Sequence, residues 1–175
     1  DATVPVTVID SRAVGMALGF VVLAAAEAAQ RGAQPEEVAQ VAAKVAQGAQ
    51  LLFYVDTLEY LRRGGRIGVA SAAVGTALRV KPLLQLVDGR VMPLEKARTA
   101  NKALARLADI TMERVGDSDV DVAVQHLAAP DRAEALAAEL AGRLGRDDIL
   151  VNEVGAVVGA HVGPGMVSVS IAPRP

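Results

Sequence analysis

The stretch Leu83–Leu94 (LLQLVDGRVMPL) predicts a β-hairpin and decides the class of the fold. Two aliphatic runs flank Asp88-Gly89, a pair that favours a two-residue type I′ turn because both central positions of that turn need a positive φ. Pro93 has no backbone N–H to donate, so we expect the second strand to lie at the edge of a sheet. Lys81-Pro82 favours an extended chain leading into the hairpin.

Strands and helices alternate on both sides of this hairpin. Short β-branched or aliphatic runs predict strands, and apolar residues at helical spacing predict helices. The expected strands are Val4–Ile9, Leu51–Val55, Val120–Val124, Ile149–Val154 and Met166–Ile171. The expected helices are Ala13–Arg31, one from Pro35 that Gly48 stops, a short turn at Leu58–Leu61, Ala70–Leu78, one from Thr99, and Pro130–Leu144, which Gly145 closes. This order predicts an α/β fold with a mixed sheet, flanking helices and a β-hairpin.

The composition excludes several classes of function. The chain has 175 residues, of which 52% are hydrophobic and 22% charged, so it can bury a core. Its aromatic residues are Phe20, Phe53, Tyr54 and Tyr60, too few to stack bases, and we expect no nucleic-acid partner. The chain has no Cys, and its two His lie far apart in sequence. We therefore expect no metal, no cofactor and no thiolate nucleophile.

The most apolar stretch, Ala13–Ala26, is shorter than the roughly 20 residues that a membrane-spanning helix needs. Because Gly15 and Gly19 interrupt it and Glu27 follows it, we expect a buried helix and no integral membrane segment. The N-terminus has no basic segment before an apolar run, which argues against a signal peptide. Together with the absence of Cys, these features predict a cytoplasmic protein.

Charge is unevenly distributed along the chain. Ten basic residues and only two acidic ones lie between Arg62 and Arg106, whereas the net charge of the whole chain is −2. This basic block favours an anionic ligand or partner, although solvated Lys and Arg beside acidic neighbours would explain it equally well. Within the block, Arg66 follows Gly64-Gly65, and such paired glycines let a backbone turn tightly and come close to a ligand or partner.

The glycine-rich segment Gly155–Gly165 carries the second candidate side chain, His161. Gly163 and Gly165 around Pro164 favour a sharp turn, which we expect to leave the imidazole open to a ligand. An imidazole N–H suits a carboxylate, although a lone His in a turn is often structural. His126, after the strand Val120–Val124, is interpreted as a packing residue, and the serines lack a nucleophile-elbow pattern, so we expect no catalytic residue.

Five segments together resemble the DegV family of fatty-acid-binding proteins. In family order they are Asp10-Ser11-Arg12, Phe53–Ile67 (FYVDTLEYLRRGGRI), Val80-Lys81-Pro82, Arg98-Thr99 and Gly159–Gly165 (GAHVGPG). The resemblance implies a two-domain α/β protein that holds a long-chain fatty acid in a tunnel. It also implies that the protein presents the carboxylate to a bacterial fatty acid kinase and catalyses no reaction itself. By motif, His161 is the implied ligand of the carboxylate, and Arg66 and Arg98 are the implied kinase-docking residues.

Family members begin with a further α/β stretch that carries an Asp-Ser-Thr-like motif, and no such stretch precedes Asp1. We therefore expect residues 1–50 to be the terminal elements of a truncated N-terminal α/β domain and residues 51–175 to form a C-terminal DegV-like domain. Two other functions stay open. One is a small-molecule enzyme with His161 as general acid or base, and the other is a structural or regulatory interaction domain without lipid.

Overall fold

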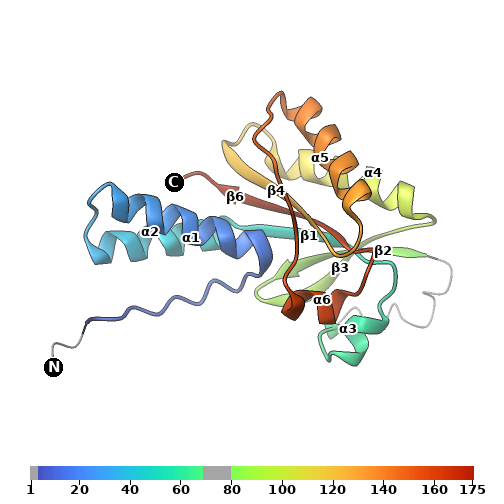
Figure 1. Cartoon of the computed structure of the whole chain (residues 1–175), viewed down its shortest axis with the longest axis horizontal. Coiled ribbons are helices and arrows are strands. Elements are labelled where there is room, and N and C mark those ends of the chain that lie inside the picture. The colour runs from blue at the N-terminus through green and yellow to red at the C-terminus, as the bar shows by residue number, and fades with distance from the viewer. Residues whose placement is uncertain (1–3, 69–79) are drawn as a thin grey trace.

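The structure is a computed structural model and describes residues 4–68 and 80–175. Helices and strands alternate through most of the chain, as the hydrophobic patterns predict (Figure 1). The helices are α1 (Gly15–Gln30), α2 (Pro35–Gly48), α3 (Glu59–Arg63), α4 (Ala100–Val115), α5 (Pro130–Leu144) and α6 (Ala156–Val162). The strands are β1 (Gln50–Tyr54), β2 (Lys81–Val87), β3 (Arg90–Ala97), β4 (Val120–His126), β5 (Leu150–Glu153) and β6 (Val167–Pro173).

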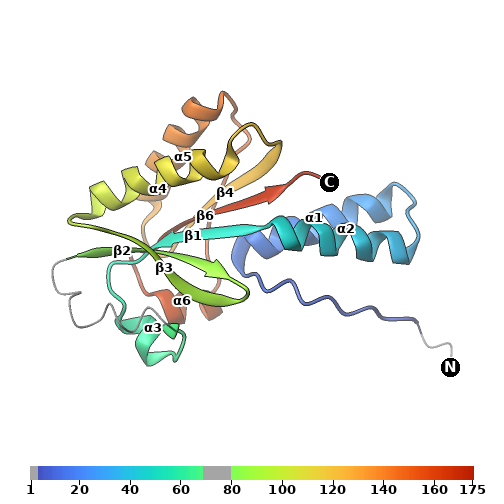
Figure 2. The same ribbon diagram turned by 180° about the vertical axis from the view of Figure 1, so that it is seen from behind.

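The strands form a six-stranded sheet in the order β3-β2-β1-β6-β4-β5. The β4–β5 pair is parallel and the other neighbouring pairs are antiparallel, so the sheet is mixed. The α/β class with flanking helices is therefore confirmed, and Figure 2 shows the same layers from behind. The last strand, β6, lies in the centre of the sheet between β1 and β4.

The hairpin has the geometry expected from its sequence. Asp88 and Gly89 have φ values of 50° and 72°, as a type I′ turn requires, and Val87 pairs with Arg90 across the turn. β3 lies at one edge of the sheet, so Pro93 costs the sheet no hydrogen bond to a further strand. The interpretation of Pro93 as an edge residue is confirmed.

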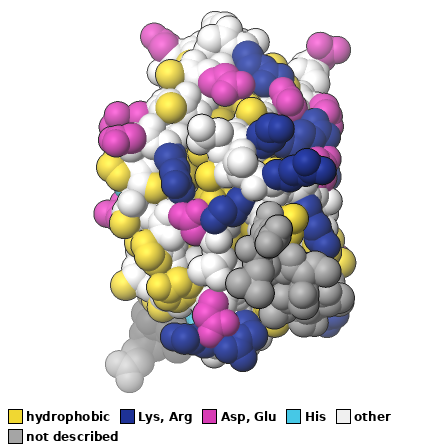
Figure 3. Space-filling model, turned by 90° about the vertical axis from the view of Figure 1, so that its right-hand side faces the viewer, with side chains coloured by type: hydrophobic (Ala, Val, Ile, Leu, Met, Phe, Trp, Pro, Cys, Tyr) yellow, Lys and Arg dark blue, Asp and Glu magenta, His cyan; other side chains and the backbone are white. Residues whose placement is uncertain are grey.

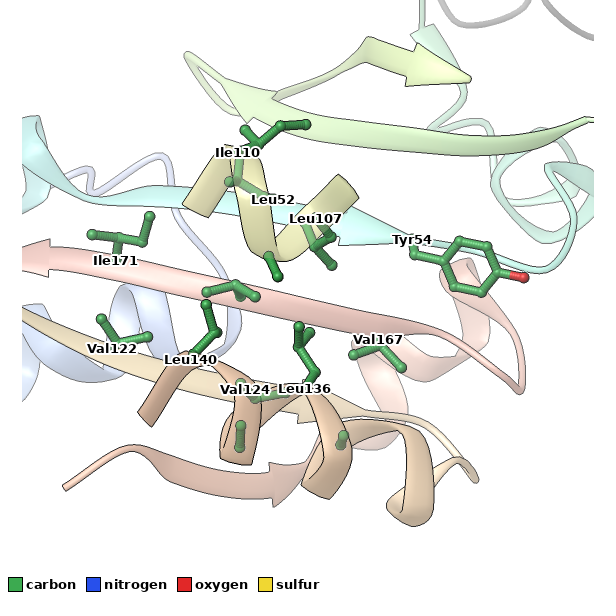
Figure 4. Packing of buried hydrophobic residues seen from close by; sticks show 14 of the residues in the cluster. Leu52, Tyr54, Leu107, Ile110, Val122, Val124, Leu136, Leu140, Val167 and Ile171 are labelled. Atoms are coloured by element: carbon green, nitrogen blue, oxygen red, sulfur yellow. The ribbon is translucent and has the colours of Figure 1, made fainter. Parts of the chain in front are cut away.

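Helices α4 and α5 cover one face of the sheet. Leu107 of α4 and Leu140 of α5 are fully buried, and they pack with Val122 and Ile171 from the strands. Figure 4 shows these side chains pointing toward one another between the helices and the sheet. This aliphatic cluster is the larger part of the core.

The opposite face of the sheet carries two separate groups of helices. Phe20 of α1 and Val45 of α2 pack over Ala123 and Ala172, toward one end of β4 and β6. Near the other end, α3 and α6 cover the sheet, and Leu61 is buried there (Figure 1). Because the two groups do not meet over the middle of this face, the face keeps a hollow between them.

Two expectations about local structure are wrong. Val4–Ile9 is extended but forms no strand, and Val4, Val6 and Val8 are between 79% and 89% exposed. Its β-branched residues favour an extended backbone, but a strand also needs a neighbour, which the described residues do not supply. The segment Gly155–Gly165 contains α6 rather than an open turn, because tertiary packing of Val162 and Gly159 outweighs the low helix propensity of glycine.

Of the remaining expectations, several helices are confirmed, one helix falls on residues that are not described, and the domain boundary stays a prediction. The helices α1, α2 and α5 are confirmed, with α5 at the predicted bounds Pro130–Leu144 and Gly145 left-handed after it. The expected helix Ala70–Leu78 lies outside the described residues. A domain boundary near residue 50 stays a prediction, and α1 and α2 pack on the same sheet to which residues 51–175 contribute the strands.

Candidate functional site

A pocket of about 430 Å³ lies between the start of α1, the helices α3 and α6, and the sheet. Aliphatic and aromatic side chains make up most of its wall, among them Leu51, Phe53, Leu86 and Met166. Polar side chains converge on it from distant parts of the sequence: Asp10, Ser11, Arg12, Arg66, Gln125, His161 and Ser168. An apolar hollow with a few converging polar groups is the usual form of a small-molecule site.

His161 contributes its imidazole to this pocket from the last turn of α6. The ring is partly buried, and its Nδ1 is shielded from solvent without a hydrogen-bond partner among the described residues. The backbone at His161 is helical, which corrects the expectation that this residue sits on an open turn. His126, by contrast, lies at the end of β4, where its Nδ1 accepts a hydrogen bond from the Ala129 backbone at 3.4 Å, in agreement with a packing role.

Arg66 lines the same pocket as His161. Its backbone N–H donates to the Leu61 carbonyl at 2.9 Å, and its Nη1 donates to the Gly64 carbonyl at 3.0 Å. Hydrogen bonds therefore hold both the backbone and the guanidinium of Arg66. The guanidinium remains exposed. The sequence analysis assigned kinase docking to Arg66 and carboxylate binding to His161, whereas in the structure both residues line one pocket.

Arg98 lies elsewhere, in the connection between β3 and α4, where it is exposed and takes no part in the pocket wall. Figure 3 shows Lys and Arg side chains gathered on the side of the molecule where β3 leads to α4. Part of the basic block is paired: Glu59 accepts from Arg62 and Arg63, and these contacts lower the pKa of Glu59 to about 2. Five basic side chains of the block have no ion pair within the described residues: Arg66, Arg90, Lys96, Arg98 and Lys102.

Glycines let the segments around α3 and α6 approach closely. A Cβ atom on Gly64 would lie 2.1 Å from Nδ1 of His161, and one on Gly163 would lie 2.2 Å from the ring of Tyr60. A Cβ atom on Gly165 would lie 2.0 Å from a carboxylate oxygen of Asp56. The two motifs that carry the resemblance most strongly therefore pack against each other, and their glycines are the points of contact.

Asp56 connects several segments beneath this contact, a role that no local sequence pattern indicates. Its carboxylate accepts hydrogen bonds from the Tyr54 hydroxyl at 2.5 Å, Lys81 at 3.1 Å and Arg132 at 3.2 Å. Partial burial favours the neutral acid, but these three donors together hold the pKa of Asp56 below its usual value. Arg132 also donates to the Gly165 carbonyl at 3.3 Å, so this network anchors the chain that follows His161.

The first turn of α1 is tied to the floor of the pocket. The backbone N–H of Met16 donates to Oε1 of Gln125 at 2.6 Å, and Nε2 of Gln125 donates to Asn152 at 2.8 Å. The Gly15 backbone has a φ of 59°, and a Cβ there would collide with the same Gln125 oxygen. Val14 and Gly15 at the start of this 16-residue helix line the pocket, and the positive end of a helix dipole favours an anion nearby.

A second hollow, also of about 430 Å³, adjoins the pocket on the side of α2. It is lined by Ala43, Ala46 and Ala49 together with the polar side chains of Gln47 and Asp88, and it shares residues 10–13, Leu51 and Leu86 with the pocket. The two hollows thus form neighbouring parts of one groove along the sheet. Among the described residues, no helix is long and apolar enough to pass through a bilayer.

Comparison with known proteins gives consistent matches. The family described as "Uncharacterised protein, DegV family" matches residues 2–174. A DegV domain-containing protein of Streptomyces coelicolor is 57% identical over 175 residues, which cover 99% of this chain and 62% of the relative. One from Mycobacterium tuberculosis is 41% identical over 167 residues and is covered over 60% of its length.

Solved structures have the same fold. A fatty acid binding DegV family protein from Streptococcus agalactiae matches with a TM-score of 0.89 and 30% identity, over 97% of this chain and 60% of that one. A DegV family protein from Thermus thermophilus, described by its fatty acid binding, matches with a TM-score of 0.89 and 34% identity, over 95% and 60%. The chain thus spans about three fifths of the length of these relatives. The family match and the shared sheet, helices and motifs show that this chain belongs to the DegV family.

Proposed function

We propose that this chain provides one part of a binding site for a long-chain fatty acid, with His161 and Arg66 at the carboxylate. The observation that carries the proposal is their convergence on one mainly apolar pocket. An imidazole N–H and a guanidinium both donate hydrogen bonds to carboxylate oxygens, and the guanidinium adds a permanent positive charge. Two solved relatives of similar fold are described as binding fatty acids, which supports the same ligand class here.

The apolar walls supply the affinity for the acyl tail. Each buried methylene contributes about 0.8 kcal/mol, so aliphatic side chains can hold a long tail without aromatic residues. The adjoining hollow lengthens the groove toward α2, which gives the tail a path away from His161. This chain covers 62% of the Streptomyces coelicolor relative, so the proposal concerns the part of the site that these 175 residues supply.

Replacing His161 by alanine is expected to weaken binding of palmitate by about tenfold or more, because a hydrogen bond to a charged group contributes about 1.5–3 kcal/mol. Purified protein is extracted with organic solvent for mass spectrometry, and the affinity of delipidated protein for palmitate is measured by calorimetry. His126→Ala is the control, because that ring bonds to the backbone of its own loop. Repeated recovery of no fatty acid, with no measurable palmitate binding, would favour an interaction domain without lipid.

We also propose that the protein is a binding protein that presents the carboxylate to a bacterial fatty acid kinase, in the cytoplasm, and that Arg66 and Arg98 dock this partner. Both arginines are exposed, and neither has an ion pair within the described residues, so their charges are free to meet an acidic surface. A small-molecule enzyme that uses His161 as general acid or base is the competing function. It would show turnover that His161→Ala abolishes while lipid content stays the same.

Charge reversal of Arg98 is expected to reduce kinase-dependent formation of acyl phosphate at least about tenfold while leaving the amount of bound lipid unchanged. Arg98 does not line the pocket, so its substitution separates docking from lipid binding. Arg66→Glu should reduce both measurements, because that side chain also borders the pocket. The matched control is Arg31→Glu, on the far end of α1. Unchanged acyl phosphate formation by the Arg98 variant would remove Arg98 from the docking role.

A further inference from the structure

We propose that Gly64 is a positioning residue for His161. Its missing side chain makes the space in which the imidazole turns Nδ1 into the protein and Nε2 toward the pocket as an N–H donor. This inference rests on the proposed function of the same pocket and specifies which nitrogen meets the ligand. It assigns to Gly64 a task that its place at the end of a short helix does not reveal.

The first support is the contact between α3 and α6. A Cβ on Gly64 would lie 2.1 Å from Nδ1 and 2.8 Å from Cε1 of His161, so even a methyl group cannot be accommodated while the ring keeps its place. The backbone of Gly64 has a φ of −75°, which any L-residue can adopt. Glycine is therefore required here by the imidazole and not by the conformation of the chain.

The second support is the environment of Nδ1. This nitrogen is buried, and within the described residues it has no hydrogen-bond partner. A proton on Nδ1 would point at the methylene of Gly64 without an acceptor, and a buried donor without an acceptor costs free energy. A lone pair avoids the collision, so the proton of the neutral ring belongs on Nε2, on the edge that faces away from Gly64.

The third support is that Gly64 also holds Arg66. Its carbonyl accepts from Nη1 of Arg66 at 3.0 Å, while its Cα borders the imidazole of His161. Gly64 thus contacts both the guanidinium of Arg66 and the imidazole of His161. Two donors of this kind match the two oxygens of a carboxylate head group.

A double-mutant cycle tests the inference. Gly64→Ala is expected to weaken palmitate binding to the delipidated chain by about tenfold or more, because the new methyl displaces the ring. In the His161→Ala background the same change should have no further effect, since the colliding atoms are gone. Gly142→Ala is the control, because nothing lies within 4 Å of a Cβ at that position and its substitution should leave affinity unchanged. Equal weakening by Gly64→Ala in both backgrounds would overturn the proposal.

Nitrogen NMR of histidine-labelled protein provides a measurement that does not depend on lipid. The wild-type chain should show His161 with its proton on Nε2, and Gly64→Ala should change the signals of His161 while leaving those of His126 in place. A proton on Nδ1 of the wild type, or unchanged His161 signals in the variant, contradicts the inference even where palmitate binds. Unchanged affinity in His161→Ala alone, by contrast, would defeat the proposed function and leave the NMR result to decide the role of Gly64.

Discussion

Replacing Gly163 by alanine is expected to lower the free energy of unfolding by about 3 kcal/mol, the combined cost of backbone strain and overpacking. Gly163 has a φ of 74° and a ψ of 167°, a conformation that is essentially restricted to glycine. The added Cβ would also lie 2.2 Å from the ring of Tyr60 in α3, so the ring or the backbone must shift to admit it. In a chain of this size the loss corresponds to a fall in Tm of roughly 6–12 °C.

Chemical denaturation followed by circular dichroism measures this loss. Gly145→Ala is the matched control, because Gly145 also has a positive φ, of 65°, but nothing lies within 4 Å of a Cβ there. Its free energy of unfolding should fall by only about 1 kcal/mol, the cost of placing alanine in a left-handed backbone conformation. Equal losses of stability in the two variants would contradict the prediction that the close approach of Tyr60 makes substitution of Gly163 more costly.

Replacing Leu140 by alanine is expected to cost about 3 kcal/mol of stability, because it removes a buried side chain and leaves a cavity. Leu140 is fully buried between α5 and the sheet, where it lies in the same cluster as Leu107 and Val122. Close packing on all sides limits how far neighbours can move into the space. Urea unfolding curves should show a lower midpoint with an unchanged slope.

Leu144 on the same helix provides the comparison. It is only partly buried against the same cluster, so Leu144→Ala should cost less than half as much as Leu140→Ala. A loss at Leu140 no greater than that at Leu144 would contradict the placement of the core between α5 and the sheet. Because α5 covers the face of the sheet opposite the pocket, palmitate affinity at low temperature should stay unchanged in both variants.

The elements with strong local signals were predictable from sequence. α5 combines proline at its first position, apolar residues at helical spacing and a glycine after its end, and its bounds agree with the prediction. The Asp88-Gly89 turn likewise needs only two neighbouring residues to specify it. By contrast, α6 contains an internal glycine and is short, so its stability depends on Leu127 and on α3, which lie far away in the sequence.

The site was predictable only in part, for the same reason. His161 and Arg66 stand out through their glycine neighbours, but their common pocket depends on a contact between residues about 100 positions apart. The salt bridge of Asp56 with Arg132 joins residues separated by 76 positions, and neither residue has a local pattern that indicates the pairing. Local spacing identified the side chains, whereas tertiary contacts determine what each of them faces.

The central place of β6 constrains how the protein is made. The strands β3, β2 and β1 belong to the first hundred residues, and β4 pairs with β5, but β6 alone joins these two halves of the sheet. Until residues 167–173 are synthesised, the edges of β1 and β4 that pair with β6 lack their partner strand. Such edges are sites of aggregation, so chaperone dependence should be greatest for nascent chains halted just before β6.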